Sequence, residues 1–160
     1  MIIVSACLCG VDCKYSGGNN LNEEALEIFK QGKAVLVCPE QLGGLSTPRM
    51  PCEIAGGTGA DVLDGKCRVL GSDGEYDVTD RFVKGAEETL KIARGCGAEL
   101  AVLKSRSPSC GYGIIYDGSF TGTRITGNGV TAELLERNGI RIVTEVELDR
   151  IDIGRFIKGE

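Results

Sequence analysis

Four short apolar segments constrain the fold of this chain more than any other feature of its sequence. They are rich in β-branched residues and almost continuous in apolar side chains, at residues 1–6 (MIIVSA), 34–38 (AVLVC), 100–104 (LAVLK) and 140–145 (IRIVTE). Such segments are typical of strands buried on both faces, as they are in a parallel sheet. The sequence therefore predicts a mainly parallel sheet of about four strands.

Amphipathic helical patterns alternate with these segments. They span residues 22–32, 77–97 and 129–139, and each ends at a glycine, a common stop signal just past a helix end. Strands that alternate with helices favour an α/β domain of three layers, similar to a Rossmann fold, with right-handed crossovers. Since the 160 residues contain no internal repeat and no linker, we expect one domain over residues 1–160.

Two stretches rich in glycine interrupt this alternation, at residues 40–80 and 107–129. The first is also rich in proline and aspartate, so it cannot be regular throughout. We expect it to form an ordered excursion over one edge of the sheet. It should include a small hairpin, with GSDG at residues 71–74 as the turn between KCRVL and EYDV.

The charge balance limits the partners of the protein. The chain has 18 Lys and Arg against 23 Asp and Glu, with no basic block, which argues against a general nucleic-acid-binding surface. No segment approaches the roughly 20 apolar residues of a membrane span. The first residues lack the basic and apolar regions of a signal peptide. We therefore expect a cytoplasmic protein with reduced thiols that acts on a small molecule or a protein partner; the oligomeric state stays open.

The sequence contains eight cysteines and no histidine. In a reducing compartment, several cysteines point to metal binding or catalysis more often than to disulfides. Without histidine, a transition-metal site has to rely on thiolates, and proton transfer needs another side chain or water.

Three of the cysteines follow predicted strands. Cys7 comes directly after the first strand, Cys38 ends the second, and Cys110 lies in the loop after the third. The carboxyl ends of parallel strands meet at one edge of a sheet, where open α/β sheets bind ligands, so we expect these thiols in one crevice. Cys13 lies in the loop after Cys7 and could reach the same place.

The other cysteines lie in different surroundings. Cys9 is in a loop next to the expected crevice, and its sequence context gives it no role. For the remaining three we predict simple packing as small apolar side chains; they are Cys52, Cys67 and Cys96.

Several kinds of site remain open for the converging thiols. A structural zinc site usually shows C-x2-C pairs, whereas this sequence has only C-x-C and C-x3-C spacings. A cysteine nucleophile would lack its usual histidine partner. An iron–sulfur cluster accepts thiolates from distant loops, and a cluster held by three of them leaves one iron open.

Polar residues near these cysteines are further candidates. Glu40, in the CPE motif, could act as a general acid or base at the mouth of the crevice. In KSRSPSCG (104–111), the hydroxyl of Ser107 or Ser109 could polarise a substrate, with Lys104 and Arg106 in support. A hydrolase that used serine and lysine would not explain the cysteines before this motif.

One motif points to a different function. GNGVTA (127–132) matches the G-x-G-x-x-A dinucleotide fingerprint, and Glu145 ends the next predicted strand. The preceding segment is not a buried strand, so a nucleotide site is the weaker reading. Free backbone N–H groups at the start of this helix could instead hold a carbonyl or an anion.

Longer motifs resemble a bacterial family that was formerly catalogued only as a domain of unknown function, the thiouracil desulfidase family. The resemblance extends in order over residues 2 to about 146, with VELDRIDIGRFIKGE outside it. It is carried by SACLCGVDCKYSGGNN, VCPEQLGGLSTPRMPCEI, DVTDRFVKGAEETL, LKSRSPSCG, IYDGSFTG and GNGVTAELLERNGIRIVTE.

The resemblance implies a [4Fe-4S] enzyme whose cluster is held by Cys7, Cys38 and Cys110. The open fourth iron would take the sulfur of a thiolated pyrimidine, and water would replace it, so that C=S becomes C=O without net redox change. By the same resemblance, Glu40 would be the acid/base and Ser107 the hydroxyl near the substrate.

Two cysteines set limits on this transfer. Cys9 stands where such sequences usually have an apolar residue, and Cys13 could be a fourth ligand that would close the site. The alternative function is a non-catalytic metal-binding or redox-sensing module, with zinc or a cluster on four cysteines.

Overall fold

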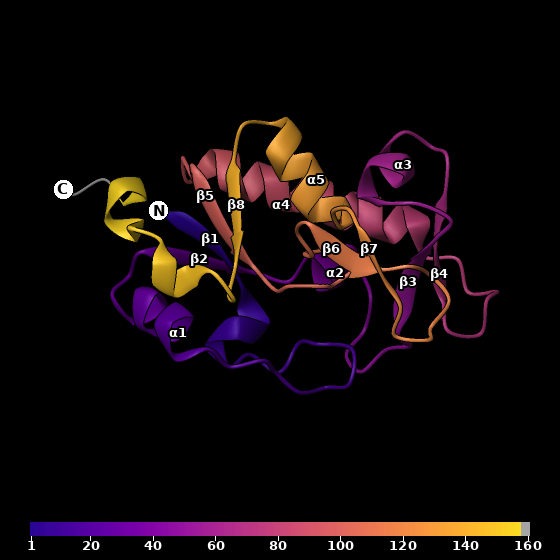
Figure 1. Ribbon diagram of the computed structural model, residues 1–160. Coiled ribbons are helices and arrows are strands. Elements are labelled where there is room, and N and C mark those ends of the chain that lie inside the picture. Colours follow the sequence, from indigo (N-terminus) through magenta and orange to yellow (C-terminus); the bar gives the residue numbers. More distant parts are fainter. Residues whose placement is uncertain (158–160) are drawn as a thin grey trace.

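The sheet at the centre of the protein has four parallel strands. The computed structural model describes residues 1–157. The strand order is β2-β1-β5-β8 (Figure 1). The strands are β1 (Ile2–Ser5), β2 (Ala34–Val37), β5 (Leu100–Leu103) and β8 (Arg141–Thr144), and each lies within one of the four predicted segments.

Helices cover both faces of this sheet, so the prediction of a three-layer α/β fold is confirmed (Figure 1). Successive residues of a strand point to opposite faces. Val4 and Val102 pack with Ala25 of α1 (Glu23–Lys30) on one face. On the other face, Ala101 packs against α4 (Thr79–Gly95) and α5 (Val130–Arg137).

The three long helices form within the predicted ranges. The start of α1 shows why: the Asn22 side chain accepts a hydrogen bond from the N–H of Ala25, at 2.9 Å. Glu23 and Glu24 occupy the first turn and Lys30 the last, which is the arrangement that the helix dipole favours. The strand and helix periodicities therefore carried enough information to define the central layers.

The excursion after β2 builds a smaller, separate core. It contains α2 (Pro39–Leu42), β3 (Cys52–Ala55), α3 (Gly59–Leu63) and β4 (Arg68–Gly71). Ile54 and Val69 face each other across the antiparallel β3–β4 pair, and both are buried in this core. Its α2 packs against α4 so closely that a Cβ atom on Gly85 would collide with the Pro39 carbonyl. This contact fixes the turn that follows β2.

The predicted hairpin at GSDG is only partly correct. The turn forms, with the N–H of Gly74 donating to the carbonyl of Gly71 at 2.9 Å. The returning arm pairs with β4 at one bridge, between Leu70 and Asp77, which is flanked by hydrogen bonds from the Gly71 N–H to the Tyr76 carbonyl at 2.8 Å and from the Val78 N–H to the Val69 carbonyl at 3.0 Å. The longer ladder of β4 is with β3. The physical reason is burial: β3 brings Ile54 against Val69, whereas the returning residues 75–77 are exposed.

Two further features were not predicted. A hairpin of β6 (Ile114–Tyr116) and β7 (Arg124–Thr126) follows β5, and a 3-10 turn, η1 (Ala6–Cys9), follows β1. After β8, the turns η2 (Leu148–Arg150) and η3 (Ile153–Phe156) place Leu148 against the core under α1.

None of the helices within residues 1–157 combines the length and the apolar character that a membrane crossing requires.

Candidate functional site

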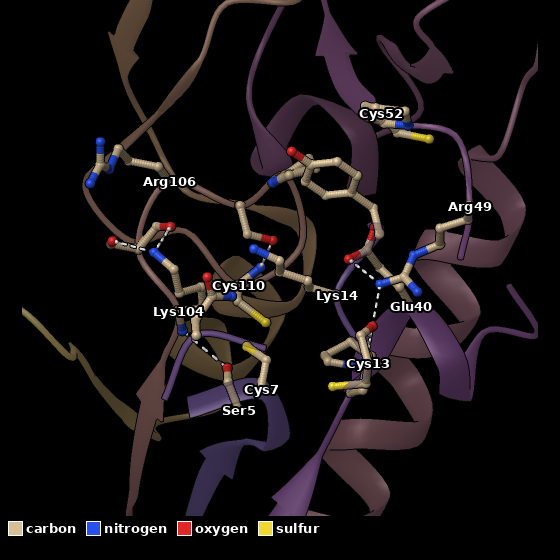
Figure 2. A pocket seen from close by; sticks show the side chains of 18 of the residues that line it. Ser5, Cys7, Cys13, Lys14, Glu40, Arg49, Cys52, Lys104, Arg106 and Cys110 are labelled. Atoms are coloured by element: carbon tan, nitrogen blue, oxygen red, sulfur yellow. Dashed lines mark hydrogen bonds and ion pairs between the residues drawn. The ribbon is translucent and has the colours of Figure 1, made fainter. Parts of the chain in front are cut away.

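A cavity of about 520 Å³ opens at the carboxyl ends of β1, β2 and β5 (Figure 2). The chain places β2 on one side of β1 and β5 on the other, and such a switch in strand order is where open α/β sheets bind ligands. Five cysteines line this cavity, namely Cys7, Cys13, Cys38, Cys52 and Cys110. The structure thus brings together the three strand-end cysteines and Cys13, as the sequence predicted.

Each strand-end cysteine is placed by a short local element. Cys7 lies in η1 directly after β1, and Cys38 is the N-cap of α2 directly after β2. Cys110 belongs to the turn after β5, and Figure 2 shows its sulfur pointing towards that of Cys7. These elements direct all three thiols to one side of the sheet edge.

The turn that carries Cys110 is held by the start of α5. The backbone N–H groups of Gly129, Val130 and Thr131 donate to the carbonyls of Gly111, Pro108 and Ser109, at 2.7–2.9 Å. The N–H groups at the start of this helix hold carbonyls, as one of the two predicted alternatives had it, but these carbonyls belong to the chain itself, so the three amides are not free for an anion or another ligand. A Cβ atom on Gly129 would lie 2.5 Å from the Ser109 carbonyl oxygen, which explains the glycine as a packing requirement.

Glu145 likewise supports the site loop and does not act as part of a dinucleotide fingerprint. Its carboxylate accepts hydrogen bonds from the Lys104 ammonium at 2.7 Å and from the Ser105 N–H at 2.8 Å. Burial by itself would raise the pKa of Glu145, but these bonds outweigh it and lower the pKa. The ion pair anchors the loop between β5 and the Cys110 turn.

Hydrogen bonds among the thiols set their charge. The Cys13 thiol bonds to both Cys7 and Cys38, and this lowers the pKa of each of those two thiols to about 7. The same interactions raise the pKa of Cys13, whose single S–H hydrogen is shared between the two neighbours, and the Cys38 thiol in turn lies 3.7 Å from the Cys13 carbonyl. Two cavity thiols are therefore readily ionised near neutral pH, the state in which thiols bind soft metals.

Cys110 differs from these thiols. Its complete burial raises the pKa well above the ordinary value, while a hydrogen bond with Ser5 acts in the opposite direction. A desolvated thiol of this kind becomes a thiolate when a cation compensates its charge.

The remaining cysteines divide into two groups. Cys9 is directed away from the cavity, and its thiol donates to the Ala25 carbonyl at 3.4 Å, which gives it a packing role against α1. Cys67 and Cys96 are half-buried and pack against core clusters, in line with the packing prediction. For Cys52 that prediction is incomplete, because this half-buried residue also lines the cavity.

Glu40 lies in the first turn of α2 and lines the cavity. Its carboxylate forms an ion pair with Arg49 at 3.2 Å, and the Arg49 side chain is only 5 % exposed. Arg49 also donates to the backbone carbonyl of Cys13 at 2.8 Å (Figure 2). It thereby connects the CPE turn to the Cys13 loop. Sequence reasoning missed Arg49, whose only signal is an arginine between two prolines.

The structure separates the two candidate serines. Ser107 lines the cavity, and its Oγ accepts hydrogen bonds from the N–H groups of Ser109 and Cys110, both at 3.1 Å. Since these bonds occupy the lone pairs, the hydroxyl hydrogen of Ser107 is left to donate. Ser109 is buried, bonds to the hydroxyl of Thr131 at 3.0 Å and does not line the cavity.

Comparison with known proteins identifies the family. The sequence model of the 2-thiouracil desulfurase family matches residues 2–147. The chain belongs to the 2-thiouracil desulfurase family. This match spans all the residues that line the cavity and ends just before η2.

Two individual proteins are similar to this chain over nearly its whole length. The chain is 49 % identical to the uncharacterized protein YbbK of Bacillus subtilis over 151 residues, 94 % of this chain and 99 % of YbbK. It superposes on the [4Fe-4S]-dependent thiouracil desulfidase TudS with a TM-score of 0.84 and 38 % identity. That superposition covers 96 % of each chain, and it confirms the α/β fold.

The donor set of this family member is suited to a cluster. Four of the cavity thiols come from three strand ends and the loop after η1, and iron–sulfur clusters accept thiolates from such distant segments. Soft thiolates with no imidazole among them match the preference of such clusters.

Proposed function

We propose that this chain is a [4Fe-4S]-dependent desulfidase that converts the C=S group of a thiolated pyrimidine to C=O, with Cys7, Cys38 and Cys110 as the cluster ligands. One observation carries the proposal: these three cysteines follow the carboxyl ends of three adjacent strands, and they line one cavity together with Glu40 and Ser107. Family membership and the likeness to TudS support the same chemistry.

The reaction consumes one water and needs no electrons, because thiocarbonyl plus water gives carbonyl plus hydrogen sulfide. A bound cluster would supply a soft iron with affinity for the thiocarbonyl sulfur, which polarises the C=S bond. The protein then has to bring a water to the ring carbon and to manage two protons. Both tasks fall to the polar side chains of the cavity.

In this proposal, Glu40 would take the proton of the attacking water. Arg49 bonds to Oε2 of the carboxylate and fixes its orientation, so the general base does not need to reorganise during the reaction. Ser107 faces the same cavity with its hydroxyl hydrogen available, and it would donate to the ring atom that gains negative charge as water adds.

Cys13 favours a second candidate function. Its thiol bonds to Cys7 and Cys38 in the same cavity, so it could act as a fourth ligand. Four protein ligands would leave no iron open for substrate, as in a non-catalytic metal-binding or redox-sensing module. In the desulfidase that we propose, Cys13 is a hydrogen-bond donor to its neighbours.

Anaerobic reconstitution tests the proposal. The loaded protein should contain about four irons and about four sulfides per chain. It should release sulfide and uracil from 2-thiouracil or 4-thiouracil. Cys38→Ser should lose the cluster and the activity, whereas Cys96→Ser, which changes a thiol at the end of α4, should keep both. Iron-loaded protein that releases no sulfide from any thiopyrimidine would reject the proposal.

Cys13→Ser distinguishes the two candidate functions. Retention of about four irons with turnover supports three ligands, whereas loss of the cluster supports the four-cysteine module. Serine keeps a hydrogen-bond donor at this position, so the substitution removes the potential ligand and preserves the donor.

A further inference from the structure

The cavity contains an aromatic residue for which neither the core nor the proposed chemistry accounts. Phe120, at the tip of the β6–β7 hairpin, is half-buried and lines the cavity. Of the partly buried apolar side chains within residues 1–157, those that pack against the three core clusters do not include Phe120. Its burial therefore does not come from packing in the interior.

Glu53 holds this residue in place from the neighbouring β3 strand. Its Oε1 accepts hydrogen bonds from the backbone N–H groups of Gly118, at 3.0 Å, and Phe120, at 3.2 Å. Gly118 contacts the backbone of β3, where a Cβ atom would collide with the carbonyl of Ile54. A carboxylate that binds two amides and a glycine that permits close contact fix the hairpin tip on β3.

A series of hydroxyl groups stiffens the same tip. Ser119 donates to the carboxylate of Asp117 and pairs with Thr121, which pairs in turn with Thr123 at 2.9 Å. The N–H of Asp117 also donates to the carbonyl of Thr123 across the base of the loop, at 3.0 Å. The loop is therefore ordered before any ligand binds.

The backbone of Phe120 is strained. Its φ is 57°, and within residues 1–157 only one other non-glycine residue, Arg106 with φ of 64°, has a positive value. Both residues line the same cavity. Non-glycine residues in the left-handed region are uncommon and concentrate at functional sites, where the surrounding structure holds them.

We propose that Phe120 binds the flat face of the pyrimidine ring and so determines the preference of the enzyme for planar heterocycles, with Glu53 as its positioning residue. This inference rests on the proposed desulfidase function. Aromatic side chains stack on bases through face contacts that do not depend on the substituents of the ring. The strained, anchored tip presents the side chain at low entropic cost, as preorganised sites do.

The test compares a planar ring with a saturated one. Equilibrium dialysis of cluster-loaded protein would measure the dissociation constants of uracil and of 5,6-dihydrouracil, whose ring is not flat. Phe120→Asn removes the ring but retains a residue type that tolerates positive φ. We expect it to weaken uracil binding about tenfold to a hundredfold, to weaken dihydrouracil binding much less, and to raise KM for thiouracil with little change in kcat.

Matched variants separate stacking from folding. Phe120→Tyr should retain the preference for uracil, and Phe120→Leu, which keeps apolar bulk, should lose it. Glu53→Leu, which removes the acceptor of both N–H groups, should shift the preference in the same direction as Phe120→Asn, and it should add little when combined with that change. Phe29→Ala, on the exposed side of α1, serves as the control and should change neither constant.

The outcomes distinguish this inference from the proposed function. If wild-type protein releases sulfide and Phe120→Asn and Phe120→Leu keep the wild-type uracil preference, the inference is wrong and the desulfidase function stands. If no thiopyrimidine reacts, but wild-type protein prefers uracil and Phe120→Asn does not, Phe120 does bind planar rings and the enzyme catalyses a reaction other than desulfuration. Equal wild-type affinity for the two rings, or no affinity for either, overturns the inference.

Discussion

Cys13 occupies an unusual position among the thiols of the cavity, because its single S–H hydrogen is shared between two neighbouring thiols that are themselves candidate ligands. Sequence spacing placed Cys13 near the crevice but could not show which thiol donates to which. That relation depends on the path of the loop after η1, where Arg49 holds the Cys13 carbonyl. The charge of the Cys7 and Cys38 thiols therefore depends on Cys13, a residue that is not one of the three proposed ligands.

The pH dependence of alkylation tests this role. In reduced, iron-free protein, Cys38 should react with iodoacetamide with a midpoint near pH 7, because the Cys13 hydrogen bond lowers the pKa of Cys38 to about 7. Reaction should fall off below that pH, where the thiolate is protonated. Cys13→Ala removes the donor and should move the midpoint up towards the ordinary value of 9.0. Cys13→Ser, which keeps a hydrogen-bond donor, should move the midpoint less. The rates are measured by peptide mass spectrometry. An unchanged midpoint in Cys13→Ala would contradict the proposed effect of Cys13 on the pKa of Cys38.

A second prediction about a single residue concerns the ion pair of Arg49 with Glu40. Its side chain is almost fully buried against the Glu40 carboxylate, so Arg49→Met leaves that charge in a poorly hydrated place without a partner. We expect the free energy of unfolding to fall by about 3 kcal/mol. Sulfide release should fall by more than about tenfold, because the carboxylate loses its fixed orientation. Arg68→Met, which breaks an exposed pair with Asp77, should lower the free energy of unfolding by less than about 1 kcal/mol in the same urea titration. Equal losses in the two variants would contradict the assignment.

At the scale of elements, continuous apolar runs and helical periodicity were sufficient to predict the four central strands and the three long helices. Of the short elements of the excursion, β4 was predicted as the KCRVL arm of the hairpin. The others, α2 (PEQL), α3 (GADVL) and β3 (CEIA), escaped prediction because none of them contains a continuous apolar run. The β6–β7 hairpin has three-residue strands, and Ile114 at its start is half exposed, so its alternation is faint. Cys52, Glu53 and Phe120 come from these elements, which is why their places at the cavity were not predicted.

The contact between α5 and the Cys110 turn yields a prediction at this scale. Gly129→Ala would place a methyl group about 2.5 Å from the Ser109 carbonyl oxygen and push the turn away from the helix start. We expect the free energy of unfolding to fall by about 1–3 kcal/mol, together with poorer retention of iron on gel filtration. Gly95→Ala, in α4 with open space around it, should instead be neutral or stabilising by up to about 1 kcal/mol. Full iron retention in Gly129→Ala would show that the contact does not position Cys110.

At the scale of the whole molecule, the order of the strands is what makes a site from distant cysteines. Cys7, Cys38 and Cys110 lie far apart in sequence, and they meet because β2 and β5 flank β1 in parallel. The rule that parallel strands end at one edge made this convergence predictable from sequence. The residues that shape the rest of the cavity depend on how the excursion folds back over that edge, which no local pattern encodes.

The most direct test of the central claim is turnover in water enriched in oxygen-18 by anaerobically reconstituted protein, with no added reductant or oxidant. We expect each uracil formed from thiouracil to carry one oxygen-18 atom at the former thiocarbonyl carbon, and one sulfide to be released for each uracil. Uracil without the label, turnover that requires an electron donor, or no uracil from protein that holds about four irons per chain would contradict the central claim.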